Sequence, residues 1–146
     1  MAVLITMVFT AVGQKDSAKI VMPKKNSGLA TLSGKWYLMP ALESDTATGH
    51  LPEITFDIRE GKFSGNTGCN RMAGTFLATD STLSFSDKMI TTRMACVGYN
   101  ESAFLQNLLR VDSYKIKRGL LVFTINGIEV SRWYHKPVKP KKTGTI

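Results

Sequence analysis

Short runs in which apolar and polar residues alternate recur along the chain and predict β-strands. In residues 54–59, Ile, Phe and Ile alternate with Thr, Asp and Arg, which places one set on each face of a strand. Asn126-Gly127 between two apolar runs is typical of a tight hairpin, because a type I′ turn needs positive φ at both positions. We expect eight short strands, at residues 35–39, 54–59, 62–64, 74–78, 82–86, 114–117, 120–125 and 128–134.

One segment follows a helical period instead. Its apolar residues recur at the spacing of one helix face: Phe104, Leu105, Leu108 and Leu109. Asn100 suits the N-cap, and Glu101 lies where the positive end of the helix dipole favours an acid, so the helix should run from 101 to about 110. The predicted fold class is mainly β: a small antiparallel barrel-like meander of about eight strands with one packed α-helix. Closure into a barrel would remove the exposed sheet edges.

Length and charge indicate one domain with basic ends. The 146 residues and a hydrophobic fraction of 43% suit a single core. Residues 31–131 contain ten Lys/Arg and ten Asp/Glu, so the net charge of +8 comes from the termini. We place the domain at residues 31–135 and a basic disordered tail at 136–146. The termini predict weak contact with anionic surfaces, and no specific nucleic-acid binding.

The first thirty residues suggest export. Residues 2–12 form an apolar run about as long as that of a signal peptide and too short to span a membrane. No basic leader precedes the run, so either the chain starts at an internal methionine or the run is an ordinary strand. We interpret residues 1–30 as a possible truncated signal segment followed by a flexible linker.

A stretch rich in glycine and asparagine, residues 65–74, contains Cys69, and residues 91–96 contain Cys96. Glycine reaches positive φ without steric cost, so this density predicts tight turns in a crossing between two strands. In an exported protein the two cysteines suggest a disulfide; two reduced, buried thiols are the alternative. Both possibilities stay open at this point.

The polar residues around the two cysteines form the candidate site. Asn70 and Thr92 could satisfy backbone groups of an irregular loop, which is a structural role. Alternatively, Arg71, Arg93 and the amides of the glycine loop could hold a small anionic or polar ligand, or the methionines could contact a protein. The complete set is Gly65, Asn66, Gly68, Asn70, Arg71, Gly74, Thr92, Arg93 and Met94.

Metal and catalytic chemistry find little support in the sequence. A zinc site needs four well-placed ligands, but the chain offers two cysteines and the distant His50 and His135, so we expect no metal and no cofactor. Both histidines lie in loop or terminal sequence and should be solvated. A cysteine nucleophile would need a nearby base, and no Cys-His motif is present. We expect that the protein is not an enzyme; the alternative is an enzyme that uses a cysteine nucleophile.

Several short segments follow one another in a particular order: Ser33-Gly34-Lys35-Trp36, Ile54-Thr55-Phe56, Ser64-Gly65-Asn66-Thr67-Gly68-Cys69-Asn70, Gly74-Thr75-Phe76, Leu83-Ser84-Phe85 and Thr92-Arg93-Met94-Ala95-Cys96. Together they resemble the META/HslJ-like domain family. The helix and the closing hairpin follow in the family's order, so the resemblance covers roughly residues 31–134.

This resemblance implies a small β-rich domain with one packed helix, found in bacterial envelope or secreted proteins, linked to stress and drug tolerance, and without an established enzymatic activity. Many members are lipoproteins, but no cysteine precedes Cys69, so this chain does not support that anchor. We therefore expect a monomeric, non-catalytic binding or structural module in the periplasm, in the envelope or outside the cell. Its expected partner is an unknown protein or a small polar ligand.

Overall fold

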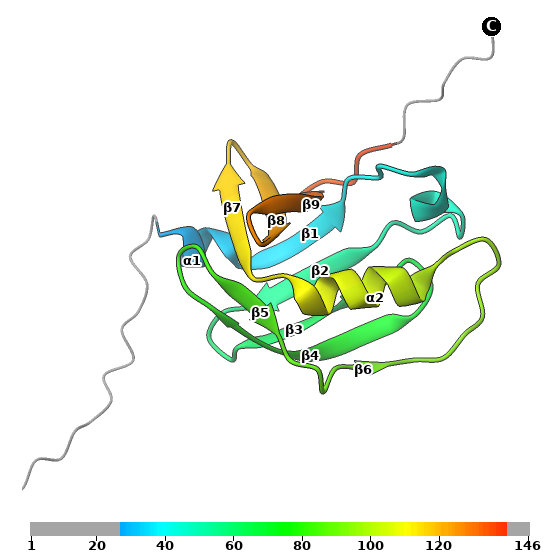
Figure 1. Cartoon of the computed structure of the whole chain (residues 1–146), viewed down its shortest axis with the longest axis horizontal. Coiled ribbons are helices and arrows are strands. Elements are labelled where there is room, and N and C mark those ends of the chain that lie inside the picture. The colour runs from blue at the N-terminus through cyan, green and yellow to red at the C-terminus, as the bar shows by residue number, and fades with distance from the viewer. Residues whose placement is uncertain (1–26, 140–146) are drawn as a thin grey trace, which may run out of the picture.

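The computed structural model describes residues 27–139 and contains one antiparallel sheet of nine strands (Figure 1). Neighbouring strands follow the order β5-β4-β3-β2-β1-β9-β8-β7, and β6 pairs with β4. The elements are α1 (Gly28–Leu32), β1 (Gly34–Leu38), the 3-10 turn η1 (Glu43–Thr46), β2 (Glu53–Asp57), β3 (Lys62–Asn66), β4 (Arg71–Ala78), β5 (Leu83–Phe85), β6 (Ile90–Thr91), α2 (Glu101–Arg110), β7 (Ser113–Lys117), β8 (Leu120–Ile125) and β9 (Ile128–Tyr134).

All eight expected strands are present, with shifted ends. The glycine-asparagine stretch is mostly strand, because β3 extends to Asn66 and β4 begins at Arg71, so the crossing is only residues 67–70. A ninth strand, β6, was not predicted. At Asn126 and Gly127 φ is 51° and 78°, which confirms positive φ at both hairpin positions.

The domain begins slightly earlier than its expected start at residue 31. Ser27 caps α1 by accepting a hydrogen bond from the amide of Ala30. Leu32, at the end of α1, is fully buried, and its carbonyl accepts a hydrogen bond from Trp36 Nε1 at 2.8 Å. The expected signal segment, most of the linker and the end of the basic tail lie outside the described residues.

The core combines aliphatic side chains with aromatic ones from strands distant in sequence. Phe56 packs edge-on against Phe76 with ring centroids 5.1 Å apart, and Phe123 contacts Trp133 at 5.3 Å. Helix α2 lies against the sheet (Figure 1) and buries Leu108 in this core. Its predicted N-cap is confirmed, because the Asn100 side chain accepts a hydrogen bond from the Ala103 amide.

The fold class is confirmed as mainly β with one packed helix, but the expected barrel is not closed. An isolated bridge between Thr82 and Ser113 and two nearby backbone hydrogen bonds connect the β5 and β7 ends of the sheet. Strand β5 forms a ladder with β4, but only this isolated bridge, and no ladder, joins it to β7 within the described residues. The sheet is therefore an open curl rather than a barrel.

Candidate functional site

The structure joins Cys69 and Cys96 in a disulfide, with Cα atoms 6.0 Å apart. The bond connects the crossing between β3 and β4 to the loop that leads into α2. We call residues 66–70, 92–96 and 99–101 the disulfide corner. Gly68 in this corner has a φ of 99°, which favours glycine, as the sequence predicted for the crossing.

Asn70 occupies the centre of the disulfide corner and is almost fully buried. Its Oδ1 accepts hydrogen bonds from the Met94 amide at 2.7 Å and from Thr92 Oγ1 at 3.0 Å. Its Nδ2 donates to the Met94 carbonyl at 3.0 Å and to the Glu101 carboxylate at 2.8 Å. The side chain of Asn70 therefore holds the loop after β6 and the start of α2 against the crossing, which is the structural role considered for Asn70 and Thr92.

Glu101, Thr67 and Tyr99 complete this network and were not predicted as site residues. The hydroxyl of Thr67 donates to the Glu101 carboxylate and accepts from the amides of Cys69 and Asn70. The Tyr99 hydroxyl donates to the Thr67 carbonyl. Burial raises the pKa of the Tyr99 hydroxyl, and nearby carboxylates raise it further. The sequence signal at Glu101 was a helix start, and that alone did not indicate a partner in the crossing.

The amides of the glycine loop already have acceptors within the loop. The Gly68 amide donates to Asn66 Oδ1 at 2.7 Å, and the next two amides donate to the Thr67 hydroxyl. These donors are therefore not directed at an external anion. Arg71 and Arg93, the cationic members of the predicted ligand site, are both exposed.

The remaining motif residues serve the strands or lie at the surface. A Cβ on Gly65 would lie 2.0 Å from the Glu53 carbonyl oxygen, so this glycine allows β3 to approach β2 closely. A Cβ on Gly74 would lie 2.9 Å from the Phe63 ring. The side chain of Met94 is exposed, while its backbone bonds to Asn70.

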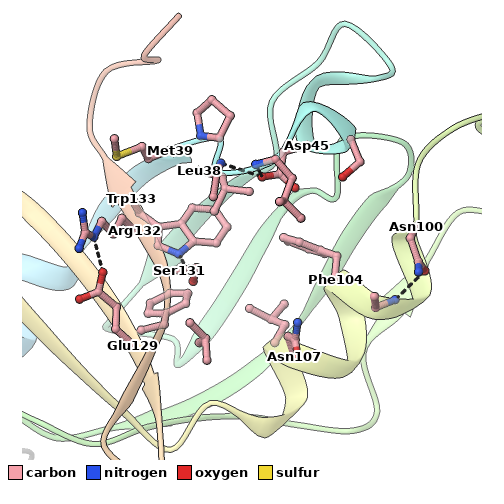
Figure 2. A pocket seen from close by; sticks show the side chains of 18 of the residues that line it. Leu38, Met39, Asp45, Asn100, Phe104, Asn107, Glu129, Ser131, Arg132 and Trp133 are labelled. Carbon is pink, nitrogen blue, oxygen red and sulfur yellow. Dashed lines mark hydrogen bonds and ion pairs between the residues drawn. The ribbon is translucent and has the colours of Figure 1, made fainter. Parts of the chain in front are cut away.

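A cavity of about 590 Å³ lies beside the disulfide corner, between α2, η1 and β9 (Figure 2). Its walls are mainly apolar, and Trp133, Leu38 and Phe104 come from β9, β1 and α2. Tyr99 of the disulfide corner also lines it. The sequence predicted Phe104 as core, but no local spacing marks the cavity, because its walls come from segments far apart in the chain.

Polar groups surround the cavity without filling it. Arg132 and Glu129 form an ion pair at the rim (Figure 2). The Asp45 carboxylate accepts from the amides of Ala41 and Leu42 at 2.8 and 2.9 Å, so it is held by its own turn. Asn107 of α2 contributes an amide to the wall. The cavity therefore combines an apolar interior with a polar edge.

A family model describes this arrangement of strands and helix: the model for the META domain matches residues 30–136. The chain belongs to the META domain family. No curated protein matches it.

Solved structures share the fold of this META domain. An NMR structure of a protein from Burkholderia xenovorans is 23% identical, with a TM-score of 0.55, and the alignment covers 84% of this chain and 97% of that one. The crystal structure of a DUF4847 family protein from Bacteroides vulgatus is 16% identical, with a TM-score of 0.57, and the alignment covers 75% and 96% of the two chains. At these identities the likeness concerns the fold alone.

The META domain shows no obvious metal centre in the part of the chain that the structure describes. Within residues 27–139, no three His, Cys, Asp or Glu side chains are grouped as metal ligands would be. His135, which was expected to be solvated, is exposed; one face of its ring stacks on Trp36 with ring centroids 3.6 Å apart, and its Nδ1 lies 2.8 Å from the Lys35 carbonyl oxygen. No helix in this same range is long and apolar enough to cross a membrane.

Proposed function

We propose that this META domain is a non-catalytic binding module of the envelope or of the secreted proteome, and that its cavity takes an apolar or amphiphilic small molecule. The observation that carries the proposal is the cavity of about 590 Å³ with mainly apolar walls. Sites for small ligands have volumes of roughly 300–1,000 Å³ and combine apolar walls with a few polar groups. The ligand class is thus more apolar than the small polar ligand expected from the sequence.

The chemistry of the walls defines how such a ligand would bind. Contact with Phe104, Leu42 and Val130, lining side chains that are partly or largely exposed, would remove apolar surface from water, at about 25 cal/mol per Å². The Asn107 amide and the ion pair of Arg132 with Glu129 lie where a polar end group would remain. An amphiphile with one compact apolar part therefore suits the site better than a fully polar ligand.

Two features of the described residues support export and a non-catalytic role. Disulfides persist in oxidising compartments such as the periplasm and the extracellular space, and this domain contains one. Both sulfur atoms are used in that bond, so neither cysteine is a thiolate nucleophile in this state. Binding of apolar compounds outside the cytoplasm would also agree with the link to drug tolerance that the family suggests.

Isothermal titration calorimetry with 1-anilinonaphthalene-8-sulfonate, an aromatic amphiphile, tests the cavity. We expect saturable binding to the full chain. Ala103 lines the cavity, so Ala103→Trp should fill it and weaken binding about tenfold or more. Gln106 is an exposed residue of the same helix outside the cavity lining, so Gln106→Trp is the matched control and should bind normally. Equal affinities of the two variants, or no saturable binding by the folded wild type, would contradict the proposal.

A further inference from the structure

A second hollow, of about 540 Å³, lies on the outer face of the sheet and shares no lining residue with the cavity. Cross-strand pairing places a row of small side chains along its floor, because Thr55 pairs with Ser64 and Ser64 with Ala73. Lys35 and Ile90 are the next residues at the two ends of this row. The small residues between the two longer side chains explain why the face is concave.

A second row, parallel to the first, carries polar and aromatic side chains. Tyr37 pairs with Glu53, Glu53 with Asn66, and Asn66 with Arg71. At the other end, Tyr134 of β9 pairs with Tyr37, and both tyrosines are partly exposed. The row therefore crosses five strands, about 19 Å at the usual spacing of ~4.8 Å between strands. This length suits an extended ligand rather than a single small ion.

The charges of the hollow leave one cation without a partner. Lys35 Nζ lies 3.1 Å from the Glu53 carboxylate, so these two charges compensate each other. Arg71 is exposed and has no carboxylate within ion-pair distance in residues 27–139. Its backbone is fixed, because its amide donates to Thr92 Oγ1 at 3.0 Å. A guanidinium on a fixed strand can bind a carboxylate with two parallel hydrogen bonds.

The side chains on this outer face of the sheet indicate which class of ligand would bind there. Hydroxyl and amide groups such as those of Thr55, Ser64 and Asn66 can both donate and accept hydrogen bonds, which matches the hydroxyls of a sugar. Beside the hollow, on the same face, the partly exposed rings of Tyr37 and Tyr134 offer apolar surface with a polar tip. A single unpaired cation is too little for a nucleic acid, whose binding depends on many phosphate contacts. We propose that this face binds an acidic oligosaccharide, with Arg71 on a carboxylate of the sugar.

Titration of the full chain with oligogalacturonate, monitored by calorimetry, tests this site. A neutral cello-oligosaccharide of equal length is the reference ligand, and we expect it to bind more weakly. Arg71→Gln should lower the affinity for oligogalacturonate about tenfold or more, because a charge-assisted hydrogen bond is lost. Arg59 is also exposed but lies outside the hollow, so Arg59→Gln should leave the affinity unchanged.

A third variant keeps the test independent of the arginine. Ser64→Tyr fills the floor of the hollow with a residue that strands accept well, and it should abolish binding without unfolding the domain. No binding of oligogalacturonate by the folded wild type would overturn the proposal. Equal effects of Arg71→Gln and Arg59→Gln would also overturn it, as would equal affinity for the neutral sugar or a higher affinity for single-stranded DNA at the same salt concentration.

Discussion

The disulfide corner and the cavity are neighbours, but their side chains have different surroundings. In the corner, the side-chain amide of Asn70 hydrogen-bonds to Met94, Thr92 and Glu101, and the loop amides have acceptors of their own. In the cavity, apolar side chains such as Phe104 and Leu42 face an open volume. The comparison teaches that the most distinctive sequence, that of the disulfide corner, has a structural role. The cavity, which has room for a ligand, is not marked by any sequence motif.

Tyr99 connects the two regions. Its hydroxyl bonds to the Thr67 carbonyl in the corner, and the residue also lines the cavity. The disulfide, which holds the loop leading to Tyr99, thus also fixes one wall of the cavity. Variants of the corner should therefore act mainly on stability, and variants of the cavity mainly on binding.

Removal of the disulfide should have the largest effect on stability. We expect the double variant Cys69→Ala and Cys96→Ala to lose about 3–4 kcal/mol, because the closed loop restricts the unfolded chain. The sequence separation of the bond is 27 residues. Urea unfolding of the variant and of the reduced and oxidised wild type would measure the loss. Unchanged stability of the reduced wild type would show that the corner does not depend on the bond.

Asn70→Ala should come next, with a loss of about 2–3 kcal/mol. The substitution leaves the amide and carbonyl of Met94, which are partly buried, without their side-chain partner, and each unsatisfied buried group costs about 1–3 kcal/mol. Asn66→Ala is the control, because Asn66 Oδ1 accepts a single hydrogen bond, from the Gly68 amide, and its loss should be near 1 kcal/mol. Equal losses in urea unfolding would contradict the central role of Asn70.

Tyr99→Phe should cost about 1 kcal/mol at neutral pH, since it removes the hydrogen bond to the Thr67 carbonyl. The folded pKa of Tyr99 is raised above its ordinary value of 10.0. The stabilisation is therefore complete below about pH 10 and is lost as pH rises through the folded pKa. Unfolding free energies measured from neutral to alkaline pH should show the difference between wild type and variant shrinking above pH 10. A constant difference would contradict the assignment.

The sequence predicted the larger strands because alternation with a period of two is visible in five or more residues. It missed β6, since Ile90 and Thr91 are too few to show a period. It assigned residues 28–30 to a linker because α1 buries little apart from Leu32. The sequence could not show whether the sheet closes, because this depends on how β5 and β7 meet after the whole chain has folded. The expected barrel was therefore wrong.

The sequence likewise predicted some features of the candidate site and missed others. Asn70 and Thr92 were recognised as possible loop supports because their side chains can bond to backbone groups. Glu101, whose carboxylate accepts a hydrogen bond from Asn70 Nδ2, lies 31 residues away from Asn70, and no local pattern indicates that contact. The cavity depends on Leu38, Phe104 and Trp133 meeting in space, so its prediction would have required the topology first.

Leu42→Ser should have the smallest effect on stability and therefore separates binding from folding most clearly. Leu42 lines the cavity, yet 67% of its surface is exposed, so its replacement should change the free energy of unfolding by less than about 0.5 kcal/mol. Its loss still removes apolar contact area, and the affinity for 1-anilinonaphthalene-8-sulfonate should fall several-fold. Leu77→Ser is the control, since Leu77 is 78% exposed and lies outside the cavity lining. If both variants bind the probe equally well, the probe does not occupy the cavity.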